Sequence, residues 1–253
     1  MNEFQIRIAG KIVRVCAMFD STKDFCRDYL YDGPADFLVQ INMDDIAFER
    51  KKSARENELE GLPVQTYSDQ YLETIAVQRK ITEELFAHDT LLFHGSVVAV
   101  DGHAYLFTAK SGTGKSTHTR LWREVFGSRA VMVNDDKPLL GISAEGVLVY
   151  GTPWNGKHHL GENICVPLKA ICILDRGEEN RIQKIAPKEA LSMLVQQSNR
   201  PQNPRLMGKY LELLDVMTRQ TAFYHLECNM ESDAARLAHE VMSGERKTNE
   251  NQR

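Results

Sequence analysis

The feature that most constrains the fold is a run of four consecutive elements in the middle of the chain. Residues 96–100 are apolar and mostly β-branched, and residues 103–107 form a second apolar run. Asp101-Gly102 joins the two runs and predicts a two-residue β-hairpin, because both turn positions require a positive φ. A glycine-rich segment at 109–114 and a helix over about 115–126 follow. An antiparallel pair that leads into a strand–loop–helix unit predicts an α/β fold with a mixed sheet.

Apolar periodicity and turn residues predict the other elements on either side of this region. Strands are predicted at 4–16 with a turn near Gly10, and at 37–41, 129–134, 138–142, 147–150, 168–175 and 221–228. Helices are predicted at 20–31, 68–87, 187–199, 205–219 and 231–243. The charge-rich segment 49–61 is interpreted as a solvated face or loop.

Charge and hydrophobicity exclude several classes of protein. The chain has 253 residues, 31 Lys plus Arg and 35 Asp plus Glu, and so a net charge of −4. This balance argues against a generic polybasic nucleic-acid binder, which needs a surplus of cations. The hydrophobic fraction of 42% argues against a mostly disordered chain. No apolar run approaches the ~20 residues of a membrane span, and the first residues lack a signal-peptide core.

The five cysteines are widely spaced and match no zinc-binding pattern. They are interpreted as buried, reduced thiols. Together with the lack of a predicted membrane segment, this predicts a cytoplasmic protein with no nucleic-acid or membrane partner.

The glycine-rich segment, here called the phosphate loop (109–117), has the spacing of a Walker A motif, with Ala109 in place of its first glycine. Backbone N–H groups of such a turn, together with the N-terminus of the following helix, surround nucleotide phosphates. Lys115 is expected to reach the β- and γ-phosphates, and Ser116 to bind Mg²⁺. The candidate nucleotide-binding residues are Ser111, Gly112, Thr113, Gly114, Lys115, Ser116 and Thr117.

The predicted hairpin also assigns a position to a histidine. If Asp101 and Gly102 are the two loop residues, Val100 pairs with His103, and His94 falls opposite Ala109. The register therefore places His94 at the mouth of the phosphate loop. The alternative interpretation is a strand-end histidine that only packs.

Two carboxylates and a lysine complete the candidate site. Asp135 and Asp136 close a predicted strand, where a carboxylate next to a phosphate loop is the expected second Mg²⁺ anchor. Two adjacent aspartates allow one to bind metal and the other to act as base. Lys157 lies in the loop Gly151–His159 and is a candidate to neutralise a transferring phosphoryl group. An ordinary turn with a packed Trp154 is the equal alternative.

With these residues identified, the chain resembles the HPr kinase/phosphorylase family and related kinases, whose catalytic domain shares the phosphoenolpyruvate carboxykinase-like nucleotide fold. The resemblance covers roughly residues 90–175. It depends on Phe93-His94-Gly95-Ser96-Val97, Ser111-Gly112-Thr113-Gly114-Lys115-Ser116 and Val133-Asn134-Asp135-Asp136. In that family the residues corresponding to His94, Asp135 and Asp136 lie at the phosphate-transfer site, where one aspartate is the base and the other helps to hold Mg²⁺.

The resemblance implies a mixed-sheet P-loop kinase domain over 89–246. An N-terminal α+β extension over 1–88, packed on that domain, and a disordered tail over 247–253 complete the expected organisation. The expected activity is ATP- and Mg²⁺-dependent transfer of the γ-phosphate to a hydroxyl, with a serine of a protein or peptide as acceptor. His94, Asp135, Asp136 and Lys157 are the expected catalytic residues, and Ser116 and Asp136 the expected metal ligands.

Other interpretations stay open at this point. One is a small-molecule kinase of the same fold, and another is a non-catalytic nucleotide-binding regulatory subunit. The sequence also leaves open the identity of the acceptor, the assignment of base and metal ligand between the two aspartates, and whether the chain forms a homo-oligomer.

Overall fold

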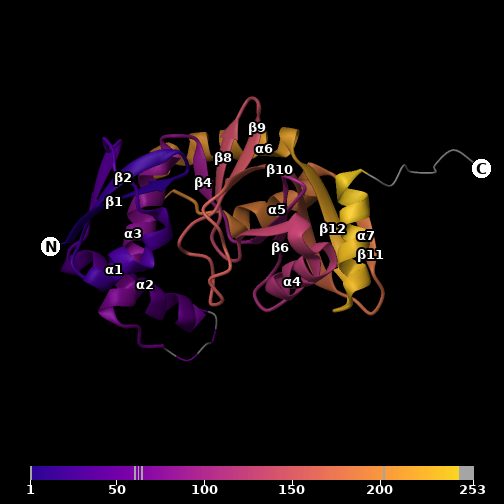
Figure 1. Cartoon of the computed structure of the whole chain (residues 1–253), viewed down its shortest axis with the longest axis horizontal. Helices are drawn as coiled ribbons and strands as arrows, with labels where there is room; N and C mark the ends of the chain where they lie inside the picture. Colours follow the sequence, from indigo (N-terminus) through magenta and orange to yellow (C-terminus); the bar gives the residue numbers. More distant parts are fainter. Residues whose placement is uncertain (1, 60, 62, 64, 202, 245–253) are drawn as a thin grey trace, which may run out of the picture. The chain divides into compact units, whose positions relative to one another are not determined.

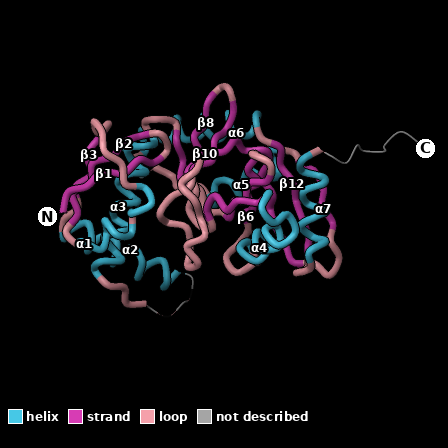
Figure 2. The backbone as a smooth tube through the Cα atoms, in the orientation of Figure 1, coloured by secondary structure: helices cyan, strands magenta, loops and turns pink. Residues whose placement is uncertain are grey.

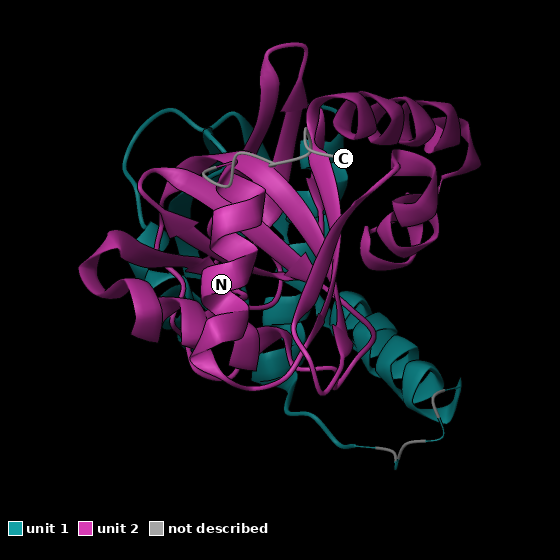
Figure 3. Cartoon of the chain, turned by 90° about the vertical axis from the view of Figure 1, so that its right-hand side faces the viewer, with its two compact units in different colours: residues 1–88 teal, residues 89–253 magenta. Residues whose placement is uncertain are grey.

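The chain divides into two compact units, Met1–His88 and Asp89–Arg253 (Figure 3). The computed structural model describes residues 2–59, 61, 63, 65–201 and 203–244. The tail predicted at 247–253 and the predicted domain end at 246 lie outside the described residues.

In its described residues, unit 1 has a three-stranded sheet and three α-helices, which are labelled in Figure 2. Its strands β1 and β2 form an antiparallel hairpin that turns at Ala9-Gly10, and β3 adds parallel to β2. The elements are β1 (Asn2–Ile8), β2 (Lys11–Ala17), α1 (Asp20–Phe25), a 3₁₀ turn (Arg27–Tyr29), β3 (Phe37–Gln40), α2 (Met43–Leu59) and α3 (Asp69–Phe86).

Helix α3 begins where the sequence predicts it. The Ser68 hydroxyl accepts a hydrogen bond from the Tyr71 amide at 3.2 Å, which satisfies one of the free N–H groups of the first turn. One face of α3 is buried, and Leu72, Ile81 and Leu85 lie on it with at most 2% of their surface exposed.

The interpretation of 49–61 as a solvated face or loop is wrong in part. Residues 43–59 form helix α2, and Glu49 on this helix is buried, with only 2% exposed. Its carboxylate accepts from Arg79 Nε of α3 at 2.5 Å. A long-range ion pair of this kind has no local sequence signal, so charge density alone predicted an exposed segment.

Unit 2 is a mixed α/β structure built on one branched sheet (Figure 1). Its strands run in the order β4-β8-β9-β10-β6-β5-β7, with β12 beside β10 and β11 beside β12. The strands are β4 (Thr90–Leu92), β5 (Ser96–Val100), β6 (His103–Thr108), β7 (Ala130–Asn134), β8 (Leu139–Ser143), β9 (Gly146–Tyr150), β10 (Cys165–Arg176), β11 (Arg181–Ile185) and β12 (Ala222–Cys228).

The long strand β10 makes this sheet mixed. It is antiparallel to β9 along its first residues, and then parallel to β6 on one side and to β12 on the other. Since β5 is antiparallel to β6, the strand that leads into the phosphate loop has one parallel and one antiparallel neighbour. The prediction of a mixed sheet from the Asp101-Gly102 hairpin is therefore confirmed.

The register predicted for that hairpin is also confirmed. Val100 pairs with His103, and the ladder continues in step to Ser96 opposite Phe107. Asp101 and Gly102 have φ values of +50° and +79°, as a two-residue turn between right-twisted strands requires.

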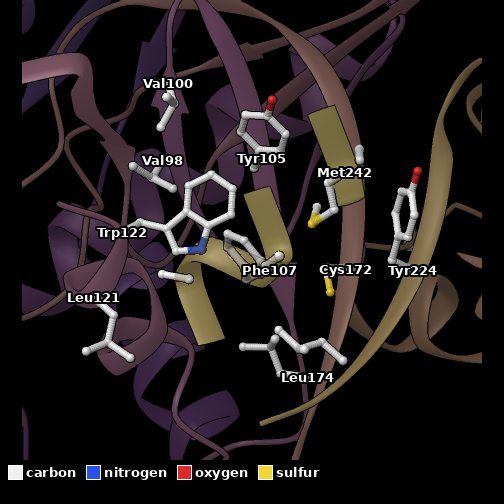
Figure 4. Close-up of a cluster of buried hydrophobic side chains, with 14 of the residues drawn as sticks. Val98, Val100, Tyr105, Phe107, Leu121, Trp122, Cys172, Leu174, Tyr224 and Met242 are labelled. Carbon is white, nitrogen blue, oxygen red and sulfur yellow. The ribbon is translucent and has the colours of Figure 1, made fainter. Parts of the chain in front are cut away.

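Helices cover both sides of unit 2. They are α4 (Lys115–Phe126), α5 (Pro187–Gln197), α6 (Met207–Gln220) and α7 (Ser232–Ser243), with 3₁₀ turns at Gly127–Arg129 and Pro204–Leu206. Helices α4 and α7 pack on each other and on the sheet, where they enclose a hydrophobic core (Figure 4). Trp122 of α4 lies at the centre of this core and is fully buried.

Two further predictions concern whole-chain properties. All five cysteines are free thiols, but the prediction that they are buried holds only for Cys26 and Cys172; Cys165 is exposed, and Cys16 and Cys228 are partly exposed. Among the described residues, no helix is long and apolar enough to cross a membrane.

Candidate active site

The phosphate loop connects β6 to α4, as the sequence predicts. Residues 109–114 leave the end of the central strand β6, and α4 begins at Lys115. Gly114 has a φ of +122°, which a residue with a side chain rarely adopts, so glycine is required for the chain to enter the helix at this angle. The amides of Lys115 and Ser116 lie in the first turn of α4, where N–H groups have no intrahelical acceptor. This geometry suits an anion at the helix N-terminus.

Lys115 is half-buried and its side chain folds back over the loop. Its ammonium donates to the carbonyl of Ala109 at 3.5 Å. Burial lowers the pKa of Lys115, the neighbouring Lys137 lowers it further, and the carboxylates of Asp136 and Asp135 oppose the shift. The lysine thus lies within electrostatic reach of both predicted aspartates.

The two aspartates follow β7 and occupy different surroundings. Asp135 is 9% exposed, and one of its oxygens accepts from the Ser96 hydroxyl at 2.5 Å. Ser96 in turn shares a hydrogen bond of 2.8 Å with the Thr119 hydroxyl of α4. Because Ser96 donates its single proton to Asp135, Thr119 donates to Ser96. Thr119 Oγ1 also lies 3.3 Å from the Ser116 carbonyl oxygen, so this chain of hydroxyls connects Asp135 to the first turn of α4.

Asp136 lies beside the predicted histidine. The distance from His94 Nε2 to an Asp136 carboxylate oxygen is 3.4 Å. Burial raises the pKa of Asp136, against the opposing charges of Lys137 and Lys115. Burial also lowers the pKa of His94 to about 3, with Lys137 and Lys115 adding to the shift and a hydrogen bond to the Gln197 side chain opposing it. Near pH 7 the imidazole is therefore neutral, and this contact is not an ion pair.

The backbone around His94 is held on both sides. Its amide donates to the Gln197 carbonyl at 2.7 Å, at the end of α5. Its carbonyl accepts from the Thr108 hydroxyl, at the end of β6, at 3.2 Å. The structure therefore places His94 at the end of β6 where the phosphate loop begins, as the hairpin register predicted.

Asn134 shapes the turn that carries the two aspartates, although the sequence predicted no role for it. The Asn134 side-chain oxygen accepts from the amides of Asp136 and Lys137 at 2.9 and 2.7 Å. Its amide nitrogen donates to the Thr152 hydroxyl at 2.9 Å. A buried asparagine that bonds to the amides two and three residues ahead fixes an Asx turn, and this fixes the direction of both carboxylates.

Lys157 is the predicted site residue with the weakest connection to the others. It is exposed in the loop between β9 and β10, and within the described part of the chain it makes no hydrogen bond or ion pair. The neighbouring Gly156 approaches the backbone of Asp135 and the Asp136 side chain closely. Trp154 is 6% exposed and packs inside the unit.

Three residues at this site had no predicted role. Ser96 and Thr119 form the hydroxyl chain to Asp135, and Arg176 at the end of β10 binds the phosphate loop from outside. Arg176 Nε donates to the Thr113 carbonyl at 3.2 Å and Nη2 to the Gly112 carbonyl at 2.5 Å. The only sequence signal for Arg176 was its position at the end of a strand predicted to be buried.

The oxygen donors fit a magnesium ion. Mg²⁺ takes one or two protein oxygens and completes its shell with water and substrate phosphates. The exposed hydroxyl of Ser116 and the carboxylates of Asp135 and Asp136 supply such donors, whereas no cluster of three His, Cys, Asp or Glu side chains occurs in the described ranges. These residues therefore do not form a site in which protein side chains supply every metal ligand.

A hollow of about 450 Å³ lies next to the phosphate loop. Lys110 contributes one wall, helix α5 another, and strands β10, β11 and β12 the floor. Its lining mixes apolar groups, such as Ile173 and Met193, with the polar groups of Gln183 and Gln196.

Comparisons with known proteins add one distant structural similarity to this geometry. No family model and no curated protein matches the chain. One solved structure that is similar is the HPr(Ser) kinase/phosphatase from Coxiella burnetii, with 9% identity and a TM-score of 0.36. The match covers 60% of this chain and 99% of that one. A similarity this distant assigns no family to the chain.

Proposed function

We propose that the protein is an ATP- and Mg²⁺-dependent phosphotransferase of the P-loop, HPr kinase-like type. Its reaction is transfer of the γ-phosphoryl group to a hydroxyl, with a serine of a protein or peptide as acceptor. One observation carries the proposal: Lys115 of the phosphate loop lies within electrostatic reach of Asp136, whose carboxylate lies 3.4 Å from His94. A site that only binds nucleotide needs the lysine but has no use for a carboxylate and a neutral imidazole at its mouth.

The phosphate loop and Lys115 hold the phosphates of ATP. The amides at the start of α4 point toward the anion, and the ammonium neutralises charge on the β- and γ-phosphates. Bound Mg²⁺ neutralises further charge on the phosphates. Asp135 and Ser116 are its proposed ligands, because the Ser96–Thr119 hydroxyls connect Asp135 to the turn that carries Ser116. This differs from the sequence-based expectation that Asp136 is the metal ligand.

Asp136 is the proposed base. The acceptor oxygen forms a bond to the γ-phosphorus while the bond from that phosphorus to the bridging β–γ oxygen breaks. The hydroxyl proton passes to the Asp136 carboxylate, and ADP leaves with the electron pair of the broken bond. Burial raises the pKa of Asp136, which makes it a better proton acceptor than an ordinary exposed aspartate.

His94 is the proposed partner of this base. Its neutral ring can donate one hydrogen bond to the Asp136 carboxylate or to a phosphoryl oxygen. In both cases it adds no positive charge to a site that already holds two lysines.

A phosphate-transfer assay with a matched pair of variants tests the function. The full chain is incubated with Mg²⁺ and γ-labelled ATP together with a lysate of its source, and labelled proteins and small molecules are separated. Asp136→Asn is expected to bind Mg·ATP within about threefold of wild type and to transfer label at least about 10²-fold more slowly. Asp215→Asn, an exposed aspartate on α6, is the control and should transfer normally.

The outcomes separate the alternatives. Label on a serine supports the proposal, and label on a small molecule assigns the alternative kinase class. A wild-type chain that binds ATP without any transfer would instead be a regulatory nucleotide-binding subunit. Equal transfer by wild type and Asp136→Asn would contradict the assignment of the base.

A further inference from the structure

Lys137 stands directly opposite His94. The Phe93 amide donates to the Pro138 carbonyl at 3.0 Å, and the Gly95 amide donates to the Asp136 carbonyl at 3.1 Å. These two hydrogen bonds flank one antiparallel residue pair. His94, between positions 93 and 95, is therefore paired with Lys137, between positions 136 and 138. Side chains of such a pair lie on the same face with their Cβ atoms about 4.5–5.5 Å apart.

The backbone of Lys137 is fixed from two other directions. Its amide donates to the Asn134 side chain at 2.7 Å, and its carbonyl accepts from the Thr152 hydroxyl at 2.8 Å. The backbone of Lys137 is therefore held in place on the His94 side of the site, whereas a lysine on an unconstrained turn would be free to extend into solvent.

The ammonium of Lys137 has no carboxylate partner. The residue is half-buried, and among the described residues no carboxylate oxygen lies within 4.0 Å of its nitrogen. The same holds for Lys115, whose only bond is a long one to a carbonyl. The charge of Lys137 lowers the pKa of His94, of Asp136 and of Lys115, in keeping with its position opposite His94. Two partly desolvated cations without a carboxylate partner are unfavourable unless an anion joins them.

We propose that Lys137 is a second phosphoryl-binding lysine, whose ammonium contacts the γ-phosphoryl group of ATP from the side opposite the phosphate loop. This inference rests on the proposed phosphate transfer and adds a residue that the phosphate-loop pattern does not contain. Because Lys137 stands beside the base and faces His94, it contacts the group that moves and not the phosphates that remain on ADP. It therefore discriminates ATP from ADP and stabilises the charge that develops during transfer.

The test compares ATP and ADP binding in variants of the full chain. Affinities for ATP, for a non-hydrolysable ATP analogue and for ADP are measured with Mg²⁺ present, together with kcat and KM. Lys137→Met keeps the stem without the charge, and Lys137→Arg keeps the charge. Lys169→Met is the control, because Lys169 is exposed on β10.

Lys137→Met is expected to lower kcat about 10²-fold and the affinity for ATP about tenfold, with ADP affinity unchanged within twofold. Lys137→Arg is expected to retain the preference for ATP over ADP. Equal loss of ATP and ADP affinity, or an unchanged kcat, would overturn the proposal. If Lys137→Met does not fold, as judged from its melting temperature, Lys137→Gln is read by the same criteria.

The measurements of nucleotide affinity distinguish a failure of this proposal from a failure of the proposed function. A wild-type chain that prefers ATP through Lys137 but transfers no phosphoryl group would support the site and reject the kinase. A chain that transfers phosphate equally well with Met at position 137 would support the kinase and reject the role of Lys137.

Discussion

The two units each contain a cluster of charged side chains, and the clusters differ in how the charges are compensated. In unit 1, Arg79 bonds to Asp45 at 3.1 Å and to Glu49 at 2.5 Å, and Lys80 bonds to Asp45 at 2.7 Å. Every cation of this cluster has a carboxylate within direct bonding distance, and the group is largely buried.

The cluster in unit 2 contains the same kinds of side chains in a different arrangement. Asp135 bonds to a serine hydroxyl and Asp136 lies beside a neutral imidazole. Within the described residues, Lys115 and Lys137 have no carboxylate within 4.0 Å. The first cluster is complete as folded, whereas the second has the arrangement expected of the anion site that we propose. In this comparison it is uncompensated charge, and not charge itself, that points to the proposed site.

The largest expected effect breaks the compensated cluster. Arg79→Met leaves the Glu49 carboxylate buried without its partner, and it should lower the free energy of unfolding by about 3–5 kcal/mol. Urea unfolding followed by circular dichroism measures this. Arg181→Met, which removes an exposed pair with Glu179, is the control and should change stability little. A near-zero effect of Arg79→Met would mean that the paired cluster is not structural.

The second prediction concerns the uncompensated cluster of unit 2, and its expected effect is a loss of activity. Lys115→Ala should reduce phosphate transfer by about 10²–10³-fold, equal to roughly 3–4 kcal/mol of transition-state stabilisation. Its free energy of unfolding should stay the same or rise, because a half-buried cation without a partner is removed. Steady-state kinetics and urea unfolding on the same preparation test both parts. Near wild-type turnover would remove the phosphate loop from the mechanism.

The sequence predicted the parts of this site that depend on local signals. The Asp-Gly turn determined the register of β5 and β6, and with it the position of His94. The glycine spacing located the start of α4, and the acidic pair at the end of a buried strand located the second side of the site.

The parts that depend on long-range packing could not be predicted in this way. The carboxylate of Glu49 is buried by an arginine thirty residues away, and β11 pairs only with β12, which lies far ahead in the chain. The sequence predicted no role for Lys137, because its position opposite His94 arises from the pairing of residues 93–95 with 136–138. A single sequence carries no signal for which of two distant segments will meet.

A third prediction concerns a histidine that unit 2 keeps uncharged. His118 of α4 is buried, and its Nε2 accepts from Trp122 Nε1 at 3.0 Å, so this nitrogen has to stay unprotonated. Burial lowers the pKa of His118 from 6.5 to about 4. Between these two values the unfolded chain takes up a proton that the folded chain refuses. Stability therefore falls as pH drops from 6.5 to 4, by roughly 3 kcal/mol over the full range.

Unfolding free energies measured from pH 7.5 to pH 4 check this prediction. His118→Phe should be less stable at pH 7.5, because the indole N–H loses its acceptor, but should show a shallower decline below pH 6.5. His103→Gln, on an exposed strand end, should follow the wild-type curve. A decline as steep in His118→Phe as in wild type would assign the acid sensitivity to other groups.

The smallest expected effect distinguishes the proposed roles of two cations, Arg176 and Lys137, in the proposed nucleotide-binding site. Arg176 is exposed and binds the carbonyls of Gly112 and Thr113, so it turns these oxygens away from the side on which the loop amides face an anion. It is a positioning residue for the whole loop. Arg176→Ala should therefore weaken ATP and ADP equally, by about tenfold, or ~1.4 kcal/mol, with kcat changed much less. Lys137→Met is expected to affect ATP alone.

Arg176→Lys, which keeps one donor group, should recover part of the loss, and Arg181→Ala serves as the exposed control. A larger loss for ATP than for ADP in Arg176→Ala would mean that this arginine contacts the γ-phosphoryl group itself, and that the uncompensated cluster contains three cations instead of two.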